Sequence, residues 1–143
     1  MAAVQPYFVA VCQAEKIAVR SGGPANYRKN IESNLERFCG LIDYCCAGNL
    51  AGKGGIAIAG PVKLVTFGEF AFTGAYMAVN PGERRFNNQD VVNHLTILIP
   101  GPETSVLAKK AVQYGIYIAA VNFEADPDWP GMHFNTGFII GPS

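Results

Sequence analysis

A carboxylate, Glu69, ends an apolar run and is followed by an aromatic loop. The run Val62–Phe67 has the length of a strand, and residues 70–74 read Phe-Ala-Phe-Thr-Gly. In an α/β protein, side chains that handle ligands gather at the carboxyl ends of the strands. Glu69 is therefore a candidate general base, because a carboxylate can take a proton from a nucleophile and return it to a leaving group. A solvated strand end or a helix cap is the alternative interpretation.

Four other side chains are candidates for a substrate pocket near Glu69, namely Phe70, Tyr76, Glu124 and His133. Phe70 and Tyr76 follow Glu69 in the same loop. Glu124 ends a later apolar run, where it could be a second acid of the site. The alternatives are plain packing for the two aromatic residues and an ordinary hydrogen-bonded loop position for His133.

Two residues near the end of the chain have other expected roles. Asn135 lies within a strand pattern, and we expect its side chain to bond neighbouring backbone groups. Trp129 lies between Asp128 and Pro130, in a loop where an aromatic side chain would suit a subunit contact.

Apolar runs alternate with helical periodicity along the chain and predict a single α/β domain over residues 1–143. The expected strands are Tyr7–Gln13, Val62–Phe67, Ile116–Asn122 and Phe134–Gly141, and the expected helices are Ala25–Ala47 and Glu103–Tyr114. The first two strands, joined through a helix, should be parallel. The segment Phe70–Asn93 is expected to be irregular.

Each expected helix carries one apolar stripe, which should face the sheet. The stripe of the first helix is Tyr27, Ile31, Leu35, Phe38, Ile42 and Cys45, and that of the second is Val106, Leu107, Ala111 and Tyr114. We expect both helices to pack on one face of the sheet and to leave the other face open.

The composition excludes several classes of protein. Half of the 143 residues are hydrophobic and 15% are charged, which is typical of a packed globular domain rather than a disordered chain. Eleven basic residues balance eleven acidic ones, so no net field favours a nucleic-acid or membrane partner. The apolar run Tyr7–Cys12 is too short for a signal or membrane segment, and a cytoplasmic location is expected.

The cysteine pattern predicts no metal site and no cofactor. None of the four cysteines forms a Cys-x-x-Cys pair, and no histidine lies at zinc-ligand spacing from any of them. We expect buried free thiols in a reducing compartment.

The order and spacing of several motifs resemble the N-terminal half of the carbon–nitrogen hydrolase family, also called the nitrilase superfamily of amidases and nitrilases. The matching segments run along nearly the whole chain and are Val9–Gln13, Asn30, Leu64–Glu69, Thr73–Tyr76, Leu107–Val121 and Phe134–Pro142. Leu64–Glu69 resembles the strand that delivers the family's catalytic glutamate. The residue before that glutamate is usually proline in the family and is Gly68 here, which also suits a sharp turn.

The resemblance implies half of an α-β-β-α sandwich and a hydrolase that acts on a small amide or nitrile. The family uses a Cys-Glu-Lys triad, in which a thiolate attacks the carbon, a carboxylate moves protons and an ammonium stabilises the tetrahedral intermediate. Only Glu69 can be carried over to this chain. The resemblance implies that Glu69 is at least partly buried, that no cofactor is needed, and that the full-length parent is a homo-oligomer.

In the family's pattern, the triad lysine and cysteine come after the position that corresponds to the last residue of this chain. Neither Lys109 nor Lys110 matches the catalytic lysine, and both are expected on the exposed side of a helix. We therefore expect residues 1–143 alone to be inactive and prone to associate through an uncovered sheet. The alternative is a non-catalytic or assembly-only chain with the same half-fold.

Overall fold

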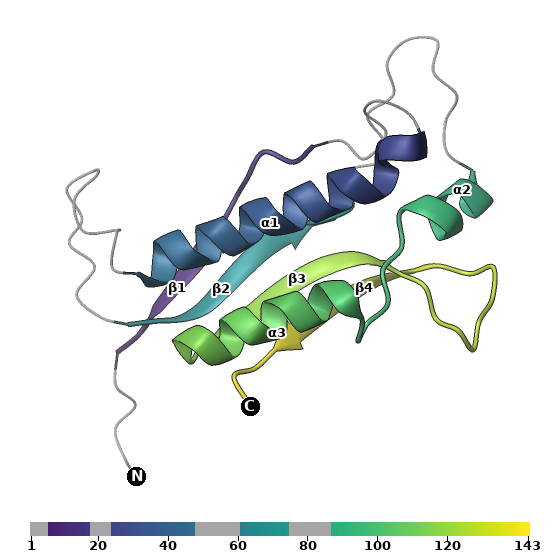
Figure 1. The fold of residues 1–143 in the computed structure, drawn as a ribbon. Helices are drawn as coiled ribbons and strands as arrows, with labels where there is room; N and C mark the ends of the chain where they lie inside the picture. The colour runs from purple at the N-terminus through teal and green to yellow at the C-terminus, as the bar shows by residue number, and fades with distance from the viewer. Residues whose placement is uncertain (1–5, 18–23, 48–60, 75–86) are drawn as a thin grey trace.

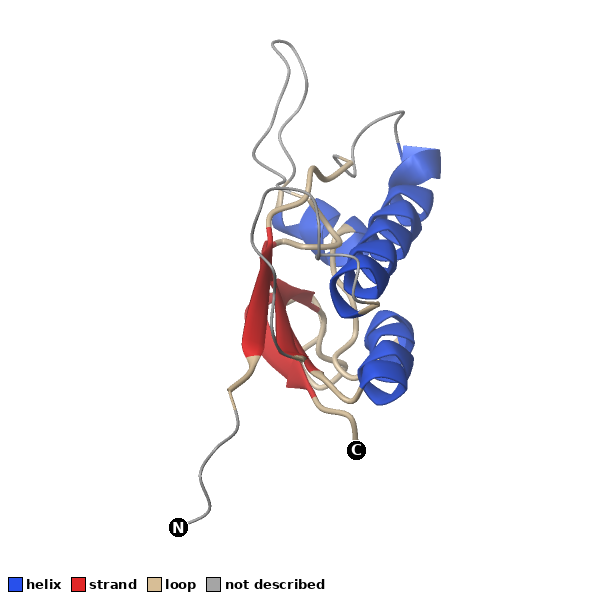
Figure 2. Ribbon diagram, turned by 90° about the vertical axis from the view of Figure 1, so that its left-hand side faces the viewer, coloured by secondary structure: helices blue, strands red, loops and turns tan. Residues whose placement is uncertain are grey.

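The structure is a computed structural model that describes residues 6–17, 24–47, 61–74 and 87–143. Its strands are β1 (Phe8–Cys12), β2 (Val62–Glu69), β3 (Tyr117–Glu124) and β4 (Phe134–Ile140). Its α-helices are α1 (Tyr27–Cys46), which follows the 3₁₀ turn Pro24–Asn26, α2 (Asn88–His94) and α3 (Pro102–Tyr114). The predicted α/β class is confirmed, with helices packed on one face of a single sheet (Figures 1 and 2).

The sheet has the order β1-β2-β3-β4, with β1, β2 and β3 parallel and β4 antiparallel to β3. Parallel strands end at the same edge of a sheet, and an antiparallel neighbour begins there. The end of β2, the end of β3 and the start of β4 therefore meet at one edge. Near this edge the register between β2 and β3 shifts between Thr66 and Glu69, as in a β-bulge.

The core lies between the sheet and the layer formed by α1 and α3. The buried apolar side chains of these elements are Ile31, Leu35, Phe38, Ile42, Leu107, Ala111, Val65, Phe67, Ile118, Ala120 and Phe123. The predicted helical stripes are confirmed at most positions, but Val106 is 38% exposed. Polar Glu103 and Thr104 are buried on α3 instead, which an apolar pattern does not indicate.

The opposite face of the sheet exposes large apolar side chains. Val9 and Val11 of β1, Tyr117 of β3 and Ile139 of β4 are all exposed. Strand side chains alternate between the two faces, so these residues point away from the helices. Among the described residues, no helix or strand covers this face (Figure 2).

A buried asparagine joins α1 to two loops. The side-chain oxygen of Asn34 accepts from the Ile17 amide at 2.8 Å, and its nitrogen donates to the Ile17 and Phe72 carbonyls at 2.9 Å each. Asn122 of β3 accepts from the Phe72 amide at 3.0 Å. The two asparagines thus hold the loop after β1 and the loop after β2 in fixed positions.

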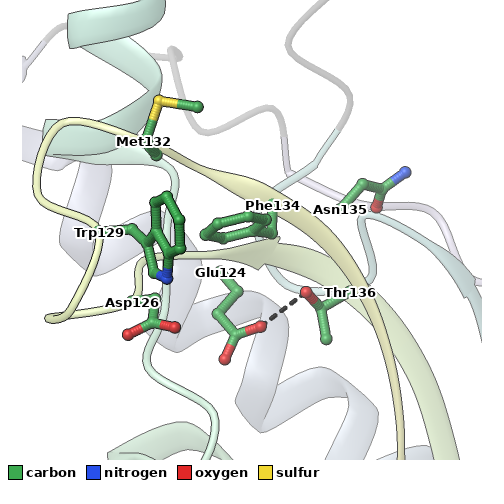
Figure 3. Close-up of a pocket in the computed structure, with 7 residues that line it drawn as sticks. All are labelled: Glu124, Asp126, Trp129, Met132, Phe134, Asn135 and Thr136. Carbon is green, nitrogen blue, oxygen red and sulfur yellow. Dashed lines mark hydrogen bonds between the residues drawn. The ribbon is translucent and has the colours of Figure 1, made fainter.

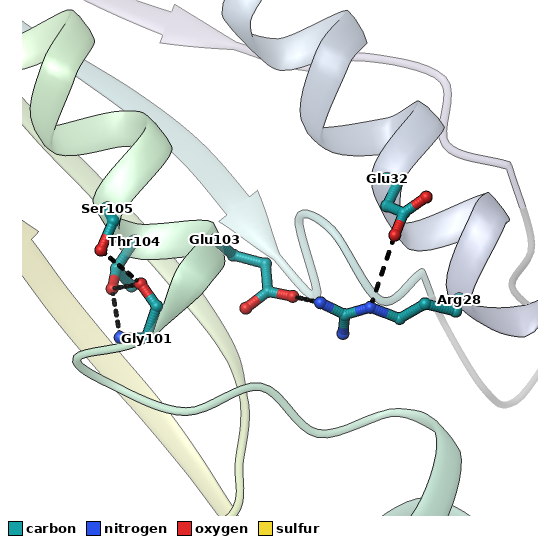
Figure 4. A network of polar contacts seen from close by, with 6 residues as sticks. All are labelled: Arg28, Glu32, Gly101, Glu103, Thr104 and Ser105. Atoms are coloured by element: carbon teal, nitrogen blue, oxygen red, sulfur yellow. Dashed lines mark hydrogen bonds and ion pairs between the residues drawn. The ribbon is translucent and has the colours of Figure 1, made fainter.

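The first turn of α3 is anchored to α1 by a charged pair. The buried carboxylate of Glu103 accepts a hydrogen bond from the Arg28 guanidinium, whose Nε lies 3.7 Å from Glu32 (Figure 4). Thr104 caps the same turn by accepting from the Gly101 amide at 2.7 Å. A buried carboxylate needs such a partner, because desolvation of an unpaired charge is costly.

The prediction that Lys109 and Lys110 both lie on an exposed helix face is wrong for Lys110. Its ammonium is half-buried and donates to Asp43 of α1 at 2.6 Å, while Lys109 is exposed. The Tyr114 hydroxyl also donates to Asp43, at 2.8 Å. These bonds hold the pKa of Asp43 below its usual range, with the Lys110 hydrogen bond as the largest cause.

The prediction that Phe70–Asn93 is irregular is wrong at its end, where α2 forms. The Asn87 side chain accepts from the Asp90 amide and the Asp90 carboxylate accepts from the Asn87 amide, at 2.9 Å each. This reciprocal pair is a capping box, and its Asn-x-x-Asp spacing was the available signal. None of the helices in the described ranges has the length and apolarity needed to cross a bilayer.

Replacing Asn34 by alanine should lower the free energy of unfolding by about 2–4 kcal/mol, because buried backbone groups of both loops lose their partner. Urea unfolding of the two proteins measures this. Glu36→Ala, at an exposed position of the same helix, should change stability by less than about 0.5 kcal/mol. An equally small effect of Asn34→Ala would show that these bonds do not stabilise the fold.

The Asp43 pairing should add stability that depends on pH. A carboxyl group with a lowered pKa in the folded state stabilises the fold above its unfolded pKa, about 3.9. The stability difference between the wild type and Asp43→Asn should therefore be constant near neutrality and shrink as the pH falls below about 4. Chemical unfolding at a series of pH values measures it, with Asp128→Asn at an exposed loop position as the control. A difference that persists in acid would contradict this pairing.

Candidate functional site

The sheet edge described above brings Glu69 next to Asn135 of β4. The Asn135 amide donates to Glu69 Oε1 at 2.6 Å. The expectation that Asn135 bonds neighbouring backbone is therefore wrong, because the antiparallel register places its side chain within reach of the carboxylate instead. An amide donor orients a carboxylate and leaves its other oxygen available for a proton.

Glu69 lies at the carboxyl end of its strand, as expected, but it is exposed rather than partly buried. Side chains along β4 alternate between the two faces of the sheet, so its partner Asn135 points to the face opposite to that of Thr136 and Phe138. Phe138 packs on the core. Asn135 and Glu69 therefore lie toward the open side of the sheet. Both side chains are exposed.

The turn after Glu69 has a strained backbone. Phe70 has a φ of 53°, a left-handed conformation that costs a residue with a side chain roughly 1–2 kcal/mol. Hydrogen bonds hold the turn in place, from the Gly74 amide to the Phe70 carbonyl at 3.0 Å and from the Ala71 amide to the Val121 carbonyl at 3.3 Å. The surrounding structure thus fixes the direction in which the Glu69 side chain leaves the strand.

The structure places Phe70 and His133 against the same ring. Phe70 stacks on Phe123 with centroids 4.5 Å apart, and His133 meets Phe123 edge-on at 5.2 Å. These contacts fit the packing alternative for Phe70. Tyr76 lies outside the described residues.

Glu124 lines a cavity of about 550 Å³ beside the start of β4 (Figure 3). The lining residues are Glu124, Asp126, Trp129, Met132, Phe134, Asn135 and Thr136. The Thr136 hydroxyl donates to Glu124 Oε2 at 2.6 Å. Asn135 belongs both to this cavity and to the Glu69 pair, whereas Phe70 and His133 are not part of the lining.

The four cysteines lie on β1 and α1. Cys12 points to the helix layer, where its sulfur is 3.9 Å from that of Cys45. Burial raises the pKa of Cys12 to about 12 and also raises the pKa values of Cys39 and Cys46. A thiol with a raised pKa is a poor nucleophile near neutrality. Within the described ranges, no three His, Cys, Asp or Glu side chains are grouped so that they could hold a metal ion.

Lys16 is a neighbour of Glu69 that the sequence did not indicate. It follows β1, and its ammonium donates to the main-chain carbonyl of Glu69, 53 positions further along the chain. Burial lowers the pKa of Lys16, and the negative charge of Glu69 acts in the opposite direction. No local pattern could have found this contact, because only the parallel pairing of β1 and β2 brings the two loops together.

The fold is shared with part of solved N-terminal amidase structures. The N-terminal amidase with a Gln-Val peptide matches 94% of this chain at 16% identity and a TM-score of 0.59, and the same amidase with a Gln-Gly peptide matches 94% at a TM-score of 0.60. A CN-hydrolase superfamily protein from Xanthomonas campestris matches at 17% identity and a TM-score of 0.49. This match covers 78% of the present chain and 31% of the Xanthomonas chain. The chain spans a quarter of the length of the amidase chains that it matches.

At this level of identity the likeness to the amidase shows the fold alone. No protein-family model matches the sequence, and no curated protein matches it.

The raised pKa of Cys12 should make its thiol slow to react. At about pH 8, iodoacetamide should alkylate Cys12 in the folded chain at least about a hundred-fold more slowly than in the urea-unfolded chain, because only the thiolate reacts. Quenched time points followed by peptide mass spectrometry measure both rates. Labelling of folded Cys12 within tenfold of the unfolded rate would contradict the environment described here.

Proposed function

We propose that this chain provides the glutamate-bearing part of a hydrolase that acts on non-peptide carbon–nitrogen bonds of a small amide or nitrile. The observation that carries the proposal is the Glu69 carboxylate, oriented by Asn135 at 2.6 Å at the carboxyl end of a parallel strand. The fold shared with N-terminal amidase supports it, because that protein is an amidase by name.

In this proposal Glu69 acts first as a general base and then as a general acid. Its carboxylate takes the proton of an attacking thiol, and the thiolate adds to the amide or nitrile carbon. With an amide, the protonated carboxyl then gives the proton to the leaving amine or ammonia. With a nitrile, it gives the proton to the nitrogen of the thioimidate, and a water molecule adds before ammonia leaves. Glu69 finally activates the water that cleaves the thioester. The Asn135 amide keeps one carboxylate oxygen engaged, so that the other handles the proton.

The thiol must come from elsewhere in the proposal. Cys12 packs against Cys45 in the helix layer, on the side of the sheet opposite to Glu69. The family resemblance assigns the nucleophile and an oxyanion-stabilising lysine to a part of the fold that residues 1–143 do not include. The open face of the sheet is where such a part would pack, and a homo-oligomeric parent also belongs to the proposal.

An assembly role without catalysis is the second candidate. Val9, Val11, Tyr117 and Ile139 expose apolar surface on one face of the sheet. Exposed apolar surface of this kind is typical of interaction sites. A protein that contains this chain and associates through this face, without any turnover, would fit this candidate.

In an active protein that contains this chain, Glu69→Gln should lower kcat by at least about a hundred-fold, because the amide cannot accept the proton. Ammonia release from a panel of amides and nitriles measures it. The panel includes Gln-Val, since the amidase neighbour was solved with that peptide.

Glu36→Gln, at an exposed position of α1, is the matched control and should retain activity. Unchanged thermal unfolding of both variants shows that the fold is intact. Near-normal turnover by Glu69→Gln would exclude the proposed base. Residues 1–143 alone should give no turnover. If the isolated monomer does hydrolyse a substrate, and Glu69→Gln abolishes that activity, a thiol from outside this chain is excluded.

A further inference from the structure

Lys16 is a charged group close to Glu69 that the proposed mechanism leaves unused. Its ammonium donates to the main-chain carbonyl of Glu69, the last residue of β2. The side chain is half-buried. A lysine gives up hydration and side-chain freedom to lie in such a place, so it needs compensating interactions there.

The segment that carries Lys16 is itself held firmly. Asn34 accepts from the Ile17 amide at 2.8 Å and donates to the Ile17 carbonyl at 2.9 Å. On the other side of Lys16, the Arg37 guanidinium donates to the Glu15 carbonyl at 2.7 Å. Both partners come from α1, so the backbone around Lys16 is tied to the helix layer.

The place where Lys16 bonds is the point at which the backbone of β2 becomes irregular. The register with β3 shifts between Thr66 and Glu69, and the next residue, Phe70, has the left-handed φ of 53°. The carbonyl that Lys16 holds belongs to the peptide unit that joins Glu69 to Phe70. Fixing that peptide unit limits rotation of the Glu69 backbone and therefore fixes the direction in which its side chain leaves the strand.

The charge of Lys16 also acts on Glu69. Burial disfavours the ammonium, and the negative charge of Glu69 partly compensates by favouring it. Lys16 and Asn135 thus approach Glu69 from different segments, one through the backbone carbonyl and the other through the carboxylate.

We propose that Lys16 is a positioning residue for Glu69, holding its peptide carbonyl and placing a positive charge near its carboxylate. The inference rests on the proposed role of Glu69 as general base. It adds a lysine that lies before the glutamate in the sequence and contacts its backbone. This role is distinct from that of the oxyanion-stabilising lysine that the resemblance implies.

The coupling is tested by titrating Lys16 in the chain by NMR, through the ¹³Cε and ¹⁵Nζ signals of its side chain. The pKa of Lys16 should lie below its ordinary value, and Glu69→Gln should lower it further, because the compensating negative charge is lost. Glu15→Gln removes a carboxylate adjacent to Lys16 in sequence and should not reproduce this fall. Equal effects of the two variants, or no effect of Glu69→Gln, would overturn the inference.

Substitution of Lys16 tests the positioning role in an active protein that contains this chain. Lys16→Met should lower kcat about tenfold or more with KM unchanged, because a misplaced catalytic group costs rate rather than binding. Lys16→Arg, which still donates to a carbonyl, should keep most of the rate. Normal turnover by Lys16→Met, or an equal loss in both variants, would overturn the inference. The Lys16 titration requires no turnover, so it separates failure of this inference from failure of the proposed hydrolysis.

Discussion

The side-chain amide of Asn34 is buried between α1 and the sheet, where it bonds both backbone groups of Ile17 and the carbonyl of Phe72. A buried amide with full hydrogen bonding stabilises a fold modestly, but the same group without partners costs more than it contributes. The loops after β1 and β2 are therefore not independent. Any movement of one leaves polar groups of the helix and of the other loop unsatisfied. The positions of Lys16 and Glu69 depend on this constraint.

The sheet is asymmetric in its surroundings, and this determines the character of the site. On one side, α1 and α3 cover side chains such as Val65 and Ile118, which are fully buried. On the other side, Val11 and Ile139 are exposed. Glu69 lies toward the exposed side, so its carboxylate is solvated. In the proposed enzyme a further layer would bury both the apolar face and this carboxylate, and burial would strengthen every electrostatic contact of the site.

Much of the architecture followed from periodic patterns. The repeat of apolar residues on α1, including Ile31, Phe38 and Ile42, predicted which face is buried, and the apolar runs predicted the strands. The position of Glu69 at the end of β2 also followed from local sequence. These features are predictable because burial of apolar surface repeats with the geometry of the element. The short helix α2 was missed, since its seven residues offer too few turns for a repeat.

The contacts that build the candidate site were decided by tertiary structure. Lys16 meets Glu69 across 53 positions of sequence, and Asn135 meets it across 66. Asn34 is buried although its residue type is typical of surfaces. Hydrogen bonds between distant polar groups repeat with no period and depend on strand order and register. The sequence by itself therefore determined the elements and the candidate base, whereas only the folded sheet decided which groups surround that base.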